Sequence, residues 1–185
     1  IVKDGMGLDT LRWAYAGGAL KPGDTSAEAT SGKAGSASAA LGRELGHPVR
    51  IYMPDWMGEE RKSLLRSLGA DLHLVSREEG GFLGAIAATE ALAAAREDVF
   101  LPCQFANQEN CNAHAASTGP EILSQLASQN LTPDAFIAGV GTGGTIMGVG
   151  RALREAAPAV KVHPLEPLDT PTLSPGYKSG APRHQ

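Results

Sequence analysis

The chain has 185 residues, of which 42% are hydrophobic and 19% charged, an ordinary composition for a globular protein large enough to bury a core. Its formal net charge of −4 excludes a general nucleic-acid-binding surface, and no apolar run approaches the roughly 20 residues of a membrane-spanning helix. Its two cysteines, Cys103 and Cys111, are too few for a disulfide framework and lack the spacing of a metal site, so we expect no bound metal.

Strand-like and helix-like segments alternate along the chain, which predicts a parallel sheet with helices on both faces. A strand–loop–helix element is expected around residues 28–36, and the polar residues 107–112 are expected to cross between two lobes. Pro and Gly dominate from residue 167 onward, where we expect loop. The predicted strands lie at 49–53, 71–75, 99–101, 135–138 and 160–165, and the predicted helices at 59–68, 84–96, 121–128 and 146–157.

The start of the chain does not have the pattern of a signal peptide, and both ends of the chain look abrupt. Residues 1–4 have neither the basic nor the apolar region of a signal peptide, and few cysteines are typical of a reducing compartment. The chain lacks a starting methionine and ends in a loop-like segment. We therefore expect a segment of a longer protein that resides in the cytoplasm.

The most informative segment is the run GVGTGGTIMG at residues 139–148, between a predicted strand and a predicted helix. A glycine-dense turn in this position exposes backbone N–H groups and the positive end of the helix dipole to an anion. Thr142 and Thr145 add hydroxyl donors. The expected ligand is a phosphate group.

Two interpretations of this loop remain open from its pattern alone. Gly139, Gly141 and Gly144 fit the dinucleotide fingerprint G-x-G-x-x-G. Glu166 lies 22 residues beyond Gly144, near the place of a ribose-binding acid. The fingerprint is weak by itself, and a purely structural tight turn also explains it.

A second candidate for anion binding is the run EATSGKAGS at residues 28–36. Its small hydroxyl residues and glycines form a nest that suits a carboxylate at a helix N-terminus, with an ordinary helix cap as the alternative. The run is not a P-loop, because Ala27 replaces the first glycine of G-x-x-x-x-G-K-[ST] and Ala34 replaces the Ser or Thr.

Several motifs together resemble the cysteine synthase (O-acetylserine sulfhydrylase) family, which belongs to the fold-type II group of pyridoxal-phosphate enzymes along with the cystathionine β-synthases. They occur in the family's order and nearly in its spacing along the whole chain. The motifs are VKD at 2–4, LKPG at 20–23, EATSG at 28–32, GADL at 69–72, QF-x-N at 104–107, TGPEI at 118–122 and GTGGT at 141–145.

The resemblance implies an α/β fold like that of the tryptophan synthase β subunit, with two lobes that are each an open, mostly parallel sheet flanked by helices. Residues 1–108 would form the small lobe and residues 109–185 part of the large lobe. It also implies pyridoxal 5'-phosphate as cofactor, an amino acid as substrate and a homodimer. The net charge and the lack of a long apolar run predict no nucleic-acid or membrane partner.

The resemblance further assigns roles to single residues. Lys3 matches the catalytic lysine that binds the cofactor covalently and later acts as the base at Cα. The 141–145 loop then holds one phosphate group, Glu166 becomes a structural or surface acid, and His114 is expected to be structural. The implied cofactor-binding residues are Lys3, Lys33, Gly141, Thr142, Gly143, Gly144 and Thr145, and the implied substrate-binding residues are Thr30, Ser31, Gly32, Lys33, Ala34 and Gln104.

The chain departs from the family pattern inside the nest. Lys33 replaces an asparagine that hydrogen-bonds the ring hydroxyl of the cofactor, and Ala34 replaces a threonine that donates to the substrate carboxylate. Loss of that hydroxyl removes a hydrogen bond to a charged group, worth about 1.5–3 kcal/mol. Lys33 either offsets the loss by pairing with the ring oxyanion or the carboxylate, or extends into solvent. Gly5 and the run NQEN at 107–110 also depart from the pattern.

Three functions follow as hypotheses from the resemblance and its departures. The first is β-replacement on an O-activated serine such as O-acetylserine, with sulfide or another nucleophile entering. The second is β-elimination, such as cysteine desulfhydration, with an atypical substrate. The third is a catalytically silent relative with a binding or regulatory role, against which the presence of Lys3 argues. The family's partner for the pyridine nitrogen would lie beyond Gln185.

Overall fold

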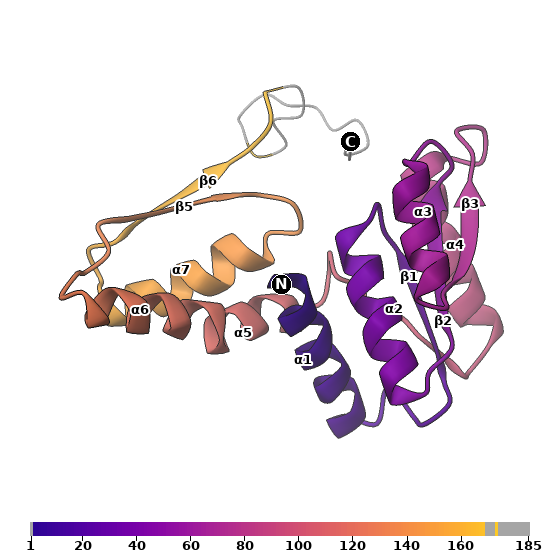
Figure 1. Cartoon of the computed structure of the whole chain (residues 1–185), viewed down its shortest axis with the longest axis horizontal. Coiled ribbons are helices and arrows are strands. Elements are labelled where there is room, and N and C mark those ends of the chain that lie inside the picture. The colour runs from indigo at the N-terminus through magenta and orange to yellow at the C-terminus, as the bar shows by residue number, and fades with distance from the viewer. Residues whose placement is uncertain (1, 169–172, 174–185) are drawn as a thin grey trace.

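The computed structural model describes residues 2–168 and Leu173, which form two parallel sheets with helices packed around them (Figure 1). The larger sheet has four strands in the order β3-β2-β1-β4. All of its pairings are parallel, with Ser26 of β1 opposite Val49 of β2. Its strands are β1 (Thr25–Ala29), β2 (Val49–Pro54), β3 (Asp71–Val75) and β4 (Val99–Phe100).

Helices cover both faces of this sheet, because its central strands bury side chains on both sides. Ile51 and Met53 of β2 are fully buried in one core, together with residues of the two helices that cover this face. Tyr52, which lies between them and points to the opposite face, packs with Ala85 in another core. The covering helices are α2 (Lys33–Leu45) and α3 (Glu59–Ser67) on the first face and α4 (Gly81–Ala95) on the second.

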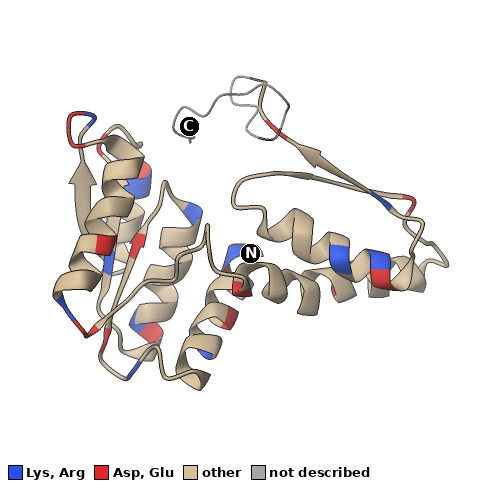
Figure 2. Ribbon diagram, turned by 180° about the vertical axis from the view of Figure 1, so that it is seen from behind, with Lys and Arg blue, Asp and Glu red and all other residues tan. Residues whose placement is uncertain are grey.

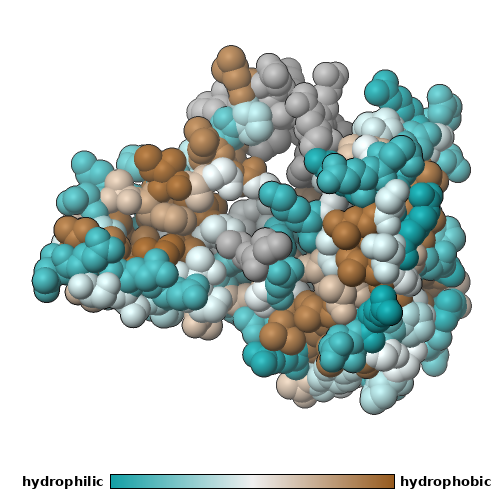
Figure 3. Space-filling view, in the orientation of Figure 1, coloured by the Kyte–Doolittle hydropathy of each residue, from teal (hydrophilic) through white to brown (hydrophobic). Residues whose placement is uncertain are grey.

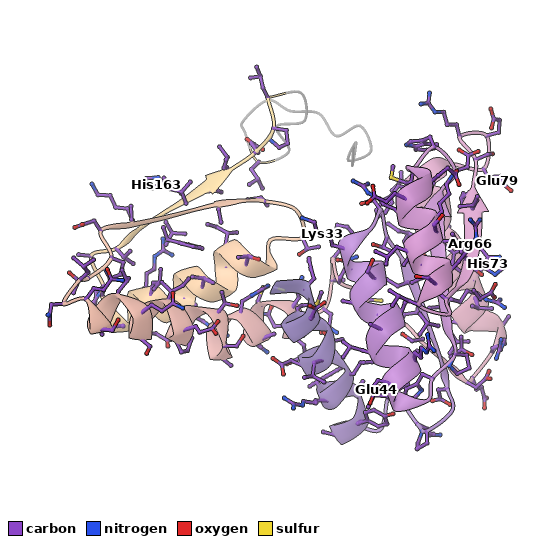
Figure 4. All side chains as sticks on the ribbon, viewed as in Figure 1. Lys33, Glu44, Arg66, His73, Glu79 and His163 are labelled. Atoms are coloured by element: carbon purple, nitrogen blue, oxygen red, sulfur yellow. The ribbon has the colours of Figure 1, made fainter. Side chains whose placement is uncertain are left out.

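The smaller sheet consists of two parallel strands, with Ala135 opposite Lys161. Its inner face packs on helices through a core of Val149, Leu153 and Phe136. No described element covers the outer face of this sheet, where Ile137 is 65% exposed. Figure 4 shows His163 on the same outer side, and Figure 3 shows apolar side chains over this part of the molecule. The elements are α5 (Glu109–Ala116), α6 (Thr118–Ser128), β5 (Ala135–Gly139), α7 (Gly144–Ala156) and β6 (Lys161–Leu165).

Glycines allow the helices of this second part to approach one another closely. A Cβ atom added at Gly148 of α7 would lie 2.7 Å from the Cβ of His114 in α5. A Cβ added at Gly119 of α6 would overlap the side chain of Ala152 in α7. The three helices therefore form a closely fitted support for the loop that precedes α7.

The first helix, α1 (Val2–Ala16), packs against α2 on one side and α5 on the other, as Figure 1 shows. Gly7 makes this approach possible, since a Cβ there would already lie 3.0 Å from Cδ1 of Leu41. The helix thereby connects the two sheets. The division into a small lobe at 1–108 and part of a large lobe at 109–185 stays a prediction.

The predicted strands and helices are confirmed, with ends shifted by a few residues. The strand at 71–75 has its predicted bounds, and the helix expected at 121–128 begins earlier, at Thr118. The stretch 107–112 does lie between β4 and the second group of helices, but α5 begins inside it, and neither α5 nor α1 is predicted from the sequence. Most of the loop expected from residue 167 lies outside the described residues.

Acidic and basic residues are interspersed over the helices and strands, without a large block of one sign (Figure 2). None of the helices in the described part of the chain has both the length and the apolar character that crossing a membrane requires.

Candidate functional site

Two strand–loop–helix turns form the candidate site, one between β1 and α2 and the other between β5 and α7. In each turn the loop follows the C-terminal end of a parallel strand and leads into the N-terminus of a helix. Ligands of open α/β sheets bind at such edges, where the unpaired N–H groups of the first helical turn favour an anion. The residues expected to bind substrate, 30–34, and phosphate, 141–145, lie on these two turns.

Thr30 organises the first of these turns. Its Oγ1 accepts hydrogen bonds from the backbone N–H groups of Gly32 (3.2 Å) and Gly35 (3.3 Å), and the residue is 3% exposed. A Cβ at Gly35 would lie 2.5 Å from Cγ2 of Thr30, so this position requires glycine. Because both acceptor positions of the Thr30 hydroxyl are used, its hydrogen is the part left to donate to a ligand.

The two departures from the family pattern lie on the same turn. Lys33 is exposed at the first residue of α2 and makes no hydrogen bond or ion pair with another described residue; Figure 4 shows it at the N-terminal end of that helix. Ala34 is buried and brings no polar group. A second cation lies beside the turn, because Nη1 of Arg61 donates to the backbone carbonyl of Ser31 at 3.1 Å.

The glycine loop that precedes α7 presents two threonine hydroxyls. Gly143 has a left-handed backbone with φ +85°, which bends the chain into the helix. Oγ1 of Thr142 accepts hydrogen bonds from Nδ2 of Asn110 (2.7 Å) and from the backbone N–H of Gly144 (3.4 Å). Oγ1 of Thr145 lies 3.3 Å from Nε2 of His114. Two side chains of α5 thus hold the two hydroxyls of the loop.

Lys3 lies in the first turn of α1 and is partly buried. Burial lowers the pKa of its amine, and the carboxylate of Glu28 opposes part of that shift. Burial also raises the pKa of Glu28, a β1 residue that accepts a hydrogen bond from Ser38. Burial and the charge of Lys3 lower the pKa of His114. Lys3 therefore interacts electrostatically with both Glu28 and His114. A lowered pKa keeps more of the Lys3 amine in the neutral form that a nucleophile needs.

Asn110 connects the expected substrate residue Gln104 with the glycine loop. Its Nδ2 donates to the backbone carbonyl of Gln104 (2.9 Å) as well as to Thr142. Gln104 is itself only 8% exposed. Asn110 was not predicted as a site residue. Its position four residues before His114 places both residues on one face of a helix, and this spacing could have indicated its role.

The chemistry of these residues fits pyridoxal 5'-phosphate. Hydroxyls and N–H groups at the start of α7 suit its phosphate group, and the amine of Lys3 suits its aldehyde carbon. A Cβ added at Gly139 or Gly141 would meet no atom within 4 Å, so open space adjoins the loop. The buried Oδ1 of Asn110, a residue of α5, has no hydrogen-bond partner among the described residues; as an acceptor it is not itself a ligand for the phosphate group.

Known proteins resemble this chain in both sequence and structure. Residues 3–185 match the family model described as pyridoxal-phosphate dependent enzyme. A cysteine synthase of Staphylococcus aureus is 39% identical over 175 residues, which are 95% of this chain and 55% of that protein. The crystal structure of a hydrogen sulfide-producing enzyme from Fusobacterium nucleatum has a TM-score of 0.93 at 53% identity and covers 97% of this chain and 54% of that one. The O-acetyl serine sulfhydrylase isoform 3 from Entamoeba histolytica has a TM-score of 0.85 at 37% identity, covering 97% of this chain and 52% of that one.

The chain therefore belongs to the pyridoxal-phosphate-dependent enzymes. Within that class it belongs to the cysteine synthase-like members of fold type II, so the fold class and the cofactor expected from the motifs are confirmed. Membership of this family argues against the dinucleotide-binding interpretation of the glycine loop, and the binding of the cofactor's phosphate group by residues 141–145 stays a prediction. The chain spans about half the length of the curated relatives it matches.

Proposed function

We propose that the chain is part of an enzyme that replaces the β-substituent of an O-activated serine, such as O-acetylserine, with sulfide or another nucleophile. The observation that carries the proposal is the position of Lys3 near His114, which in turn contacts the 141–145 loop. Burial lowers the pKa of the Lys3 amine at this position. The similarity to a cysteine synthase and to an O-acetyl serine sulfhydrylase supports the substrate class.

In this proposal the 141–145 loop binds the cofactor's phosphate group through backbone N–H groups and the hydroxyls of Thr142 and Thr145. Pyridoxal 5'-phosphate, when bound, supplies an electron sink that stabilises negative charge at Cα of an amino acid joined to it. Nζ of Lys3 would hold the cofactor covalently and, once the amino group of the substrate has displaced it, would take the proton from Cα; both tasks need the neutral amine.

The 30–34 turn and Gln104 would hold the substrate carboxylate. The hydroxyl hydrogen of Thr30 is free to donate, because its oxygen already accepts two backbone hydrogen bonds. Lys33 would pair with the carboxylate or with the ring oxygen of the cofactor, and so offset the hydroxyl that Ala34 lacks. Fixing the substrate in this way aligns its Cα with the amine of Lys3.

A second candidate is β-elimination from cysteine, which with water gives pyruvate, ammonia and hydrogen sulfide. Two observations favour it. The Fusobacterium nucleatum structure, 53% identical, is described as a hydrogen sulfide-producing enzyme. The turn that would hold the substrate carries Lys33 and Ala34 in place of the family's asparagine and threonine.

The test uses the full-length protein loaded with pyridoxal 5'-phosphate. Release of acetate and formation of cysteine from O-acetylserine and sulfide would support β-replacement, whereas pyruvate and sulfide from cysteine alone would favour elimination. Lys3→Arg keeps the positive charge but removes the primary amine, so it should abolish both reactions and the trapping of cofactor on this residue by borohydride. A wild-type protein whose cofactor spectrum responds to no β-substituted amino acid would instead be a catalytically silent relative.

We also propose a cytoplasmic location and a homodimer for the whole protein. The free thiols of Cys103 and Cys111 support a reducing compartment, and the resemblance to the cysteine synthase family supports the dimer. Light scattering of the purified full-length protein would measure its oligomeric state, and a monomeric mass would contradict the dimer.

A further inference from the structure

We propose that two buried residues of α5, Asn110 and His114, are positioning residues that turn the hydroxyl hydrogens of the 141–145 loop toward the bound phosphate group. The inference rests on the proposed function and deepens it, since it says how the loop is prepared for an anion. A threonine hydroxyl has one hydrogen to donate and two positions that accept, so its neighbours decide where the hydrogen points. A hydroxyl whose hydrogen points into the protein offers an anion only its lone pairs.

The helix α5 is a rigid support for this purpose. A Cβ at Gly144 would fall on the Asn110 side chain, 2.8 Å from its Nδ2, and one at Gly148 would lie 2.7 Å from the Cβ of His114. Asn110 and His114 are 2% and 1% exposed, so neither side chain has room for another arrangement. The two helices are in such close contact that a residue on α5 fixes the atoms at the start of α7.

The amide of Asn110 sets the direction of the Thr142 hydroxyl. The backbone carbonyl of Gln104 can only accept, so it holds Nδ2 of Asn110 on its side at 2.9 Å. The same Nδ2 donates to Oγ1 of Thr142 at 2.7 Å, and the N–H of Gly144 donates to that oxygen at 3.4 Å. Both acceptor positions of Thr142 are then occupied, and its hydrogen is left for the ligand.

The imidazole of His114 sets the direction of the Thr145 hydroxyl in the same way. Its Nδ1 lies 3.0 Å from Oγ1 of Thr118, and its Nε2 lies 3.3 Å from Oγ1 of Thr145. A neutral imidazole carries its hydrogen on one nitrogen. With that hydrogen on Nε2, His114 donates to Thr145 and accepts from Thr118, which leaves the Thr145 hydrogen free for the phosphate.

The first experiment compares two ligands that differ only in the phosphate group. Apoprotein is prepared from the full-length protein, and the dissociation constants of pyridoxal 5'-phosphate and of pyridoxal are measured by absorbance or fluorescence titration. Asn110→Asp keeps the shape of the side chain but presents an oxygen to Thr142, which draws the hydroxyl hydrogen away from the ligand. The matched control is Asn112→Asp on the same helix, where Oδ1 already accepts from Arg151 at 3.0 Å.

Asn110→Asp should weaken the binding of pyridoxal 5'-phosphate roughly 10- to 100-fold, the range expected for a lost hydrogen bond to a charged group. The dissociation constant of pyridoxal should change by less than about threefold in Asn110→Asp. In Asn112→Asp the dissociation constants of both ligands should stay within the same limit. Equal affinity of wild type and Asn110→Asp for pyridoxal 5'-phosphate would overturn the inference, as would an equal loss for both ligands. A wild-type protein that does not prefer pyridoxal 5'-phosphate to pyridoxal would overturn the proposed function itself.

The second experiment tests the tautomer of His114 with two amides. The Gln side chain of His114→Gln reaches the place of Nε2 and can donate to Thr145, whereas the shorter Asn of His114→Asn reaches only the place of Nδ1, near Thr118. His114→Gln should bind pyridoxal 5'-phosphate with an affinity within about threefold of wild type, and His114→Asn should bind it roughly 10-fold more weakly. Thermal unfolding of both apoproteins shows that they are folded, and the reverse order of affinities would overturn the assignment of His114.

Discussion

The side chain of Asn110 fills the space that a Cβ on Gly144 would need, with its Oδ1 and Nδ2 both inside contact distance of that point. The first residue of α7 therefore has to be glycine as long as the Asn110 side chain keeps its place. The same amide holds Thr142 and the backbone of Gln104. The contact between these two residues joins the expected phosphate site to the expected substrate site.

Gly144→Ala should destabilise the apoprotein, because the added methyl group must displace the Asn110 amide from a fully packed position. Overpacking of this kind costs about 1–3 kcal/mol in the free energy of unfolding. Urea denaturation of the apoprotein measures the loss. The matched control is Gly141→Ala, where a Cβ would meet no atom within 4 Å, and a loss as large there would contradict the explanation.

Glu28→Gln should stabilise the protein relative to wild type by an amount that grows as the pH rises above 4.5. Burial raises the pKa of Glu28 in the folded protein, so the folded state keeps a proton that the unfolded chain loses near the ordinary value of 4.5. Stability falls with rising pH wherever the folded state binds more protons than the unfolded state. This carboxyl's contribution is therefore fully present below pH 4.5 and is lost as the pH rises through the folded-state pKa.

Glutamine has no such proton to lose, and its oxygen can still accept the hydrogen bond from Ser38. Denaturant unfolding of both proteins between pH 4.5 and pH 8 gives the difference in free energy at each pH. A difference that stays constant over this range would show that Glu28 titrates as it does in the unfolded chain.

Parts of the fold could not be predicted because their buried residues are polar. Only the end of strand β1 is predicted, within the element expected around residues 28–36. Its sequence, TSAEA, is buried at every position but shows no apolar alternation, because Ser26 and Glu28 are among its buried residues. The helix α5, with the sequence ENCNAHAA, buries Asn110 and His114 in place of the usual apolar stripe. Glu28, Asn110 and His114 have hydrogen-bond partners in other segments, namely Ser38, Thr142 and Thr145. Such partners leave no periodic pattern in the sequence.

The glycine loop could be predicted because its signal is local. Its glycines and threonines lie within seven residues, between a strand and a helix that their apolar residues reveal. The electrostatic group of Lys3, Glu28 and His114 could not be found in this way, because its members come from α1, β1 and α5. Motif order assigned Lys3 to the site, but only the packing of α1 between α2 and α5 brings the other two groups near it.

The amine of Lys3 should react with an acylating reagent at a pH where an ordinary lysine is still protonated. Burial lowers its pKa from 10.5, and the charged form is the one that burial disfavours. Competitive labelling of the apoprotein over a pH series, read by mass spectrometry, gives the midpoint of the reactive form. Glu28→Gln should lower that midpoint further, since it removes the carboxylate that favours the charged amine. A midpoint at or above 10.5 would contradict the burial seen here.

Lys33→Asn should weaken binding of the anionic ligands and reduce the salt dependence of that binding. Lys33 is exposed, is without a partner among the described residues, and stands at the N-terminus of α2, where its charge adds to the helix dipole. Pairing with a carboxylate or ring oxyanion would contribute roughly 1 kcal/mol at this exposed position, or about fivefold in the dissociation constant. The contribution should shrink in high salt, because exposed charges are screened within about 10 Å at 0.1 M.

Titration of the loaded full-length protein with O-acetylserine at low and high salt measures this effect. Lys33→Arg keeps the charge and should stay close to wild type, while Lys21→Asn removes an exposed charge from the turn that precedes β1 and controls for the change in net charge. If Lys33→Asn and Lys21→Asn give the same small change, then Lys33 extends into solvent in the complex as well. In that case the lost hydroxyl at Ala34 goes uncompensated, and Ala34→Ser should then tighten binding of O-acetylserine roughly 10-fold by restoring a donor to its carboxylate.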